Sequence, residues 1–237
     1  MKVGLLSDVH ANVTALEAVL AEIGSVDALW VCGDTVGYGP DPSDVLALLR
    51  ERGATLVAGN HDRAVATGED LELFNRHAAS AALLHQGWLS AEERDTLASL
   101  PRTLEEGDVT LCHGSLRDPL WEYVTNVRAA AVSLDLAKTS HCCAGHTHVP
   151  AFFQPGEARV GHVRYGAAYQ LAPRAFVNPG SVGQPRDGDP RAAYATLDLA
   201  EGTITFHRSS YQIDETQRRM RARGLPAILA DRLAFGL

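Results

Sequence analysis

Five short, largely apolar runs, each ending directly at a polar motif, constrain the fold of this 237-residue chain more than any other feature. Short apolar runs that stop at turn-forming residues are typical of buried β-strands. Helical periodicity follows the first two runs, and strands that alternate with helices predict βαβ units and a mostly parallel sheet. The predicted strands are Lys2–Ser7, Ala28–Cys32, Ala54–Ala58, Val109–Cys112 and Ser140–Ala144.

The helices between these strands are indicated by capping residues as well as by periodicity. Asn12 is a suitable N-cap for a helix through Leu20, and Asp41-Pro42 opens a second helix through Leu49. An alanine-rich stretch between about residues 70 and 100 has helical periodicity, and Val127–Ala137 is predicted as another helix.

The pattern changes after Ala151, where short alternating segments predict antiparallel strands. These segments include Arg159–Tyr165, Ala193–Leu199 and Thr203–His207. A helical tail follows from about Asp214, and its apolar stripe is predicted to dock on the body through Met220, Leu225, Ile228, Leu229 and Leu233. With no repeat, linker or low-complexity segment, and with 46% apolar and 21% charged residues, we expect a single domain over residues 1–237.

Polar side chains follow each of the five predicted strands at its end. In open α/β sheets, ligands bind beyond the carboxyl ends of the strands, so these side chains are expected to meet at one rim. Imidazole, carboxylate and amide ligands suit Mn, Fe, Co, Ni or Zn and are too rich in nitrogen for a calcium site. The residues concerned are Asp8, His10, Asp34, Asn60, His61, His113, His146 and His148.

Each of these residues also has a structural interpretation when taken alone. Asp8 and Asp34 could cap helices, Asn60 could be a turn residue, and His113 could be a packed histidine. The constellation as a whole favours a metal site.

The four cysteines are predicted to be buried packing residues, with thiolate ligation as a weaker alternative: Cys32, Cys112, Cys142 and Cys143. The remaining histidines are predicted as surface or packing residues: His77, His85, His141, His162 and His207.

Five ordered motifs in the chain resemble those of the calcineurin-like metallophosphoesterase superfamily. They read Asp8-Val9-His10, Gly33-Asp34, Gly59-Asn60-His61-Asp62, His113-Gly114 and Gly145-His146-Thr147-His148. The resemblance implies an α/β fold built as a four-layer αββα sandwich of two mixed sheets, with residues 151–209 supplying much of the second sheet.

Within the superfamily the chain is most similar to small bacterial phosphodiesterases and diadenosine-tetraphosphatase-like proteins. The segments that carry this narrower likeness are Gly33–Pro40 and Asn178–Gly183. The chain departs from the pattern at Gly37, where many superfamily members have an aspartate.

The resemblance also implies roles for individual residues. One divalent metal ion would take Asp8, His10 and His148, the second would take Asn60, His113 and His146, and Asp34 would bridge both through its two oxygens. Manganese is the first choice, with Fe, Ni, Co, Zn or Mg as alternatives. His61 would protonate the leaving group as a catalytic acid while Asp62 orients its imidazole. Arg117 and Arg186 could bind a substrate phosphate, or could form exposed ion pairs.

The predicted activity is hydrolysis of phosphodiester or phosphoanhydride bonds in a small phosphorylated substrate, with a phosphodiesterase as the first choice. A dinucleoside-polyphosphate hydrolase and a broad phosphatase acting on monoesters are the alternatives within this class. An alternative from another class is a non-catalytic binding scaffold on the same fold, which would be expected to have a damaged constellation.

The charge and the cysteine pattern limit the partners and the compartment. A net charge of −8 disfavours binding to duplex DNA or to an anionic membrane surface. No apolar stretch approaches the roughly 18 residues of a membrane-spanning helix. Four cysteines without a CxxC pair favour a reducing, cytoplasmic compartment. The sequence does not determine the oligomeric state.

Overall fold

The computed structural model describes residues 1–237, and its core is a pair of stacked six-stranded sheets. In the first sheet the strand order is β3-β2-β1-β11-β12-β9, parallel from β3 to β1 and antiparallel from β1 onward. The strands are β1 (Lys2–Leu6), β2 (Ala28–Cys32), β3 (Thr55–Val57), β9 (Ala168–Gln170), β11 (Ala192–Asp198) and β12 (Thr203–Ser209).

The second sheet has the order β4-β5-β6-β10-β7-β8, with a parallel centre and antiparallel edges. The helical crossover between β5 and β6 makes them parallel neighbours, whereas the hairpins β4–β5 and β7–β8 pair antiparallel. The strands are β4 (Thr103–Glu106), β5 (Val109–Cys112), β6 (His141–Cys143), β7 (Ala151–Gln154), β8 (Glu157–Val160) and β10 (Ala175–Asn178).

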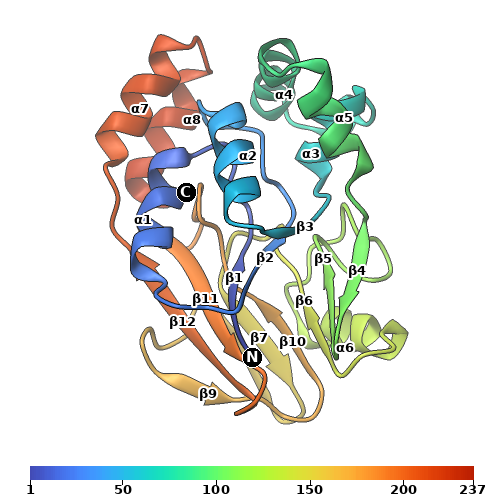
Figure 1. The fold of residues 1–237 in the computed structure, drawn as a ribbon. Helices are drawn as coiled ribbons and strands as arrows, with labels where there is room; N and C mark the ends of the chain where they lie inside the picture. The colour runs from blue at the N-terminus through green and yellow to red at the C-terminus, as the bar shows by residue number, and fades with distance from the viewer.

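Three hydrophobic clusters define the layers. The largest lies between the two sheets, where for example Leu5 and Trp30 of the first sheet pack in one cluster with Phe152 of the second. The outer face of the first sheet is covered by α1 (Val13–Glu22) and α2 (Pro42–Glu51). The outer face of the second sheet is covered by α6 (Val127–Leu136). The predicted αββα sandwich with two mixed sheets is therefore confirmed (Figure 1).

The remaining helices lie at the upper end of the sandwich as drawn in Figure 1. They are α3 (Asn60–Thr67), η1 (Leu71–Leu73), α4 (Arg76–Trp88), α5 (Ala91–Ser99), α7 (Ile213–Ala222), α8 (Ala227–Asp231) and η2 (Arg232–Phe235). The C-terminal tail docks as predicted, because Met220, Leu225, Leu229 and Leu233 are buried in one cluster that also contains Tyr38. The prediction is wrong for Ile228, which is 51% exposed.

Three sequence predictions of secondary structure need correction. The predicted strand Arg159–Tyr165 ends at Val160, because Gly161 has a positive φ of 68°. The segment 151–209 is divided between the sheets: β7, β8 and β10 join the second, whereas β9, β11 and β12 complete the first. Helix α3 was missed, and it begins inside the Gly59–Asp62 motif. None of the helices is both long and apolar enough to cross a lipid bilayer.

Candidate metal centre

The candidate site lies at the junction of the two sheets, where the loops after five strands meet. The loops after β1, β2 and β3 come from the first sheet, and those after β5 and β6 from the second. Seven residues of these loops other than glycine have φ values between 48° and 67°: Asp8, His10, Ala11, Asp34, Tyr38, His146 and His148. Such angles cost of order 1–3 kcal/mol each and persist where the surrounding structure fixes the side-chain direction.

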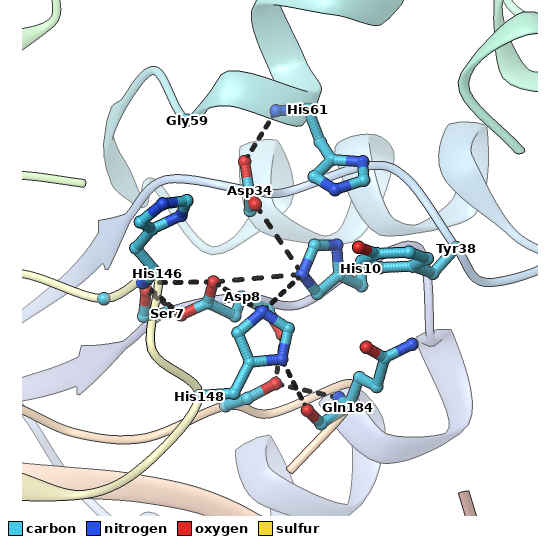
Figure 2. A network of polar contacts seen from close by, with 12 residues as sticks. Ser7, Asp8, His10, Asp34, Tyr38, Gly59, His61, His146, His148 and Gln184 are labelled. Carbon is cyan, nitrogen blue, oxygen red and sulfur yellow. Dashed lines mark hydrogen bonds and ion pairs between the residues drawn. The ribbon is translucent and has the colours of Figure 1, made fainter. Parts of the chain in front are cut away.

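The first cluster contains two carboxylates and two imidazoles, all buried. Asp8, His10, Asp34 and His148 each place one donor atom within 4.8 Å of the others. Asp8 Oδ1 lies 3.2 Å from His148 Nε2 and 3.8 Å from His10 Nε2. The two Nε2 atoms are 3.1 Å apart (Figure 2). The arrangement offers oxygen and nitrogen donors that converge on one point.

The second cluster adjoins the first and is formed by Asp34, His113 and His146. His113 Nε2 lies 3.0 Å from His146 Nδ1 and also 3.0 Å from Asn60 Oδ1. The structure thus brings together all seven residues that the sequence predicted as metal ligands. Their division into two groups also follows the predicted one.

Asp34 belongs to both clusters, although in a different way from the one expected. Its Oδ2 lies 3.3 Å from His113 Nε2 and 3.7 Å from His10 Nε2, so a single oxygen faces both groups. Its Oδ1 instead accepts a 2.9 Å hydrogen bond from the backbone N–H of His61. Gly59 permits this arrangement, since a Cβ at that position would lie 2.0 Å from Asp34 Oδ1.

Backbone carbonyls fix the tautomer of every histidine in the two clusters. One ring nitrogen of each lies 2.6–3.1 Å from a carbonyl oxygen: His10 with Val36, His113 with Cys32, His146 with Trp121 and His148 with Gln184. A carbonyl can only accept, so that nitrogen carries the hydrogen, and in a neutral imidazole the other nitrogen then presents a lone pair.

These lone pairs face each other at 3.0–3.1 Å, beside two carboxylates. Opposed lone pairs repel unless a proton or a cation lies between them. Carbonyl contacts that orient the ligating histidines are a regular feature of metal sites. The donor set therefore fits a pair of divalent cations of the borderline type.

The charges in the site are strongly coupled. Burial would raise the pKa of Asp8, but the neighbouring His148 holds it well below its ordinary value. Burial opposes the charged form of His113, but the Asp34 carboxylate outweighs it and raises the pKa of His113 to about 9. Burial, together with the charge on His113, lowers the pKa of His146 to about 3. Metal ions would therefore compete with a proton at His113, whereas His146 is already deprotonated at neutral pH.

His61, the predicted catalytic acid, lines the same cavity as Asp34, His146 and His148. Its ring packs against Tyr38 and Phe74, with centroid distances of 4.4 and 4.7 Å. Asp62, however, does not orient it in the expected way. The Asp62 carboxylate accepts backbone hydrogen bonds from Val36 at 3.0 Å and from Gly59 at 2.9 Å, while His61 Nδ1 is buried without a partner. Asp62 therefore positions the loops around His61 and not the imidazole itself.

The two arginines differ in their placement. Arg186 lines the cavity and lies over the Tyr38 ring, with its Cζ 5.7 Å from the centroid, and it forms no ion pair with a carboxylate. Arg117 lies outside the cavity, is 58% exposed and pairs with Glu122. The exposed-ion-pair alternative is therefore the right one for Arg117.

The cavity also contains residues that sequence reasoning missed. Tyr38, Phe74, Trp121 and Tyr123 line it together with the predicted residues. Tyr38 lies within the Gly33–Pro40 segment, where the glycine at position 37 indicates a turn. The aromatic residues of the 114–126 loop carry no local signal, because nothing in their spacing indicates that the loop folds over the rim.

The remaining cysteines and histidines behave mostly as packing residues. All four cysteines are buried and free, and burial raises the pKa of each thiol, so the sulfur atoms serve the core and not the metal centre. His85 is fully buried and supports the loop after β2. Its Nδ1 accepts a 3.0 Å hydrogen bond from Gly37 N–H, and its Nε2 donates to Gly39 O at 2.7 Å.

The four-layer sandwich and the paired Asp/His clusters define a protein of the metallophosphoesterase class. A family model described as the calcineurin-like phosphoesterase superfamily domain matches residues 1–202. The chain therefore belongs to the calcineurin-like phosphoesterase superfamily.

Comparisons with individual proteins agree with this assignment. A metallophosphoesterase from Sphaerobacter thermophilus is 42% identical, with a TM-score of 0.90 and complete coverage of both chains. An uncharacterised protein of Methanocaldococcus jannaschii is 32% identical over 99% of this chain and 98% of its own length. A symmetrical bis(5′-nucleosyl)-tetraphosphatase of Pectobacterium atrosepticum is 40% identical, but over 26% of this chain and 24% of its own.

Proposed function

We propose that the protein is a dinuclear metal-dependent phosphoesterase that hydrolyses phosphodiester or phosphoanhydride bonds of a small substrate. The observation that carries the proposal is the pairing of four histidine ring nitrogens around Asp34, next to a cavity lined by His61 and Arg186. A binding scaffold would have no need for an acid–base residue and a guanidinium without a carboxylate partner beside an intact set of metal donors.

Two bound cations would supply Lewis-acid stabilisation of phosphate oxygens and a water molecule of lowered pKa. Asp8, His10 and His148 would hold one cation, and Asn60, His113 and His146 the other, with Asp34 contributing to both groups. The guanidinium of Arg186 would donate hydrogen bonds to a non-bridging phosphate oxygen, an interaction that suits its planar fork. The Tyr38 ring would keep that guanidinium over the cavity.

His61 would donate a proton to the departing oxygen. Burial lowers the pKa of the free His61 imidazole to about 4, although the Asp34 carboxylate opposes this effect. A bound phosphate brings further negative charge beside the ring, and an opposite charge within a few ångströms favours the protonated imidazole. The bound substrate would thus raise the pKa of His61 and favour its protonated form. General-acid catalysis of this kind increases the rate by about 10²–10⁴-fold.

Diester hydrolysis is the first choice within this class, manganese is the preferred metal ion, and a reducing cytoplasm is the expected setting. A second candidate is hydrolysis of dinucleoside polyphosphates. It is favoured by the partial matches to bis(5′-nucleosyl)-tetraphosphatases, which include a 30% identical Vibrio cholerae protein over 53% of this chain. Both reactions would use the same metal centre and the same acid.

The test is manganese-dependent hydrolysis of bis(p-nitrophenyl) phosphate by the wild type and by His61→Ala. His162→Ala is the matched control, since that histidine is exposed on the β8–β9 segment. We expect chelator-sensitive turnover that is unchanged in the control. In His61→Ala the loss should approach about 10²–10⁴-fold with a dinucleoside monophosphate, whose alkoxide leaving group needs a proton, and should be smaller with bis(p-nitrophenyl) phosphate, whose leaving group is a stable anion. Turnover that survives both chelation and His61→Ala would contradict the mechanism, and no turnover with any divalent metal ion would favour the scaffold.

A further inference from the structure

One wall of the cavity is apolar, although its floor contains the Asp34 carboxylate and the imidazoles of His146 and His148. The wall is formed by Leu73, Phe74, Trp121 and Tyr123. Leu73 and Phe74 lie just before α4, whereas the other two residues lie in the loop after β5. The rings of Phe74 and Trp121 meet edge to face with centroids 5.0 Å apart, so two segments distant in sequence form a continuous surface.

Tyr123 presents a free aromatic face at the mouth of this cavity. Its inner face stacks on the His146 ring, with a centroid distance of 3.9 Å and an interplanar angle of 21°. The residue nevertheless remains 52% exposed, and its neighbour in the wall, Leu73, is 59% exposed. Large apolar groups that stay in water beside a functional cavity mark a surface where a ligand is bound.

The cavity is also lined by Arg186 and Tyr38. A phosphate held in this cavity would therefore have both a guanidinium and an aromatic wall within the same lining. An inorganic phosphate or a small alkyl ester would contact the floor and Arg186 but would make no contact with the apolar wall. A nucleotide would use all three, because its phosphate carries the charge and its planar base has a face to stack.

We propose that Tyr123 is a stacking platform for a nucleobase, and that the substrates are phosphodiesters or phosphoanhydrides of nucleotides. The base would extend the stack that His146 and Tyr123 begin, while Phe74 and Trp121 close its side. The inference rests on the proposed function, since the phosphate must sit at the metal centre for the base to reach Tyr123. Stacking of a base on an aromatic side chain corresponds to a change of about 5–150-fold in affinity.

The test compares two esters with the same leaving group, thymidine 5′-(p-nitrophenyl phosphate) and ethyl p-nitrophenyl phosphate, in the manganese-loaded protein. In both, water adds to phosphorus and releases a proton to the solvent, the bond to the p-nitrophenyl oxygen breaks, and p-nitrophenolate leaves with the bonding electrons. The measured quantity is the ratio of the two kcat/KM values. A ratio cancels any general loss that a variant causes at the metal centre, which Tyr123 also contacts.

We expect the wild type to prefer the thymidine ester, and we expect Tyr123→Ala to reduce that preference about 5–150-fold. Tyr123→Phe should retain the preference, because it keeps the ring. Leu83→Ala is the matched control, an exposed apolar residue of α4 outside the cavity. No preference in the wild type, a preference that persists in Tyr123→Ala, or one that is lost equally in Tyr123→Phe would each overturn the proposal. Failure to hydrolyse either ester would instead count against the proposed function.

Discussion

The Cα atom of Gly37 lies against the imidazole of His61, so closely that a Cβ at that position would come within 2.3 Å of Nδ1. The φ of Gly37 is 92°, which side-chain-bearing residues rarely adopt. This contact gives a physical reason for the departure from the superfamily pattern. An aspartate at this position could not coexist with the present place of the His61 ring.

Gly37→Ala is therefore expected to impair catalysis and not merely to strain a turn. The methyl group would displace His61, so kcat should fall toward the 10²–10⁴-fold loss typical of a missing general acid. Gly156→Ala is the control, since Gly156 also has a positive φ, of 79°, but nothing lies within 4 Å of its added Cβ. Steady-state kinetics should show a loss in the first variant alone. Equal activity in the two variants would mean that the ring tolerates displacement.

Asp34→Asn should weaken both metal sites, whereas His148→Ala should weaken one. The reason is that Asp34 Oδ2 faces both clusters, while His148 belongs to the first alone. Metal content after dialysis, measured by mass spectrometry, checks this expectation. If the two variants lose metal equally, the clusters do not act as separate sites.

Arg186→Met should weaken substrate binding, and Arg117→Met should not. Arg186 lines the cavity without a carboxylate partner, whereas Arg117 is occupied by Glu122 outside it. Loss of a charged hydrogen bond worth about 1.5–3 kcal/mol corresponds to a decrease in kcat/KM of roughly 10–150-fold. The measurement is kcat/KM of both variants with bis(p-nitrophenyl) phosphate as the substrate. An effect of similar size from Arg117→Met would refute the assignment.

His85 should make the stability of the protein depend on pH. Burial lowers its pKa from 6.5 to about 3, although a hydrogen bond to Gly39 opposes this. The folded state then binds fewer protons than the unfolded one, so the contribution of His85 is complete above pH 6.5 and declines as the pH falls toward 3. At pH 5 it should be smaller by about 2 kcal/mol, from 1.36 kcal/mol per pH unit over the interval below 6.5.

Urea denaturation of the wild type and of His85→Gln at pH 7.5 and pH 5 would measure this change. The difference in the free energy of unfolding between the two proteins should shrink by that amount at the lower pH. A difference that is the same at both pH values would show that His85 does not become protonated on unfolding.

Much of the metal centre could be predicted because its signals are local. A buried strand that ends in Asp8 or Asp34 can be recognised from about ten neighbouring residues, and parallel strands bring such ends to one rim. Asp62 could not be placed in this way. Its carboxylate turns to the N–H groups of Val36 and Gly59, and a carboxylate next to a histidine in sequence gives no indication of that direction.

The contacts that orient the histidines were also beyond prediction from sequence. These hydrogen bonds are accepted by backbone carbonyls, and every residue has a carbonyl whatever its side chain. The carbonyls concerned are those of Val36, Cys32, Trp121 and Gln184. Tyr123 is a similar case, because its importance depends on how the loop after β5 folds against His146. Both features depend on the path of the main chain through space.

Each of the two Asp/His clusters draws on both halves of the molecule. His148 comes from the second sheet to join Asp8 of the first, and His113 comes from the second to meet Asp34. A bound cation would consequently clasp the halves together, and its binding energy would oppose their separation. The stability of the contact between the two sheets would then depend on the metal ions as well as on the hydrophobic core. Loss of metal would loosen the loops that position its own ligands.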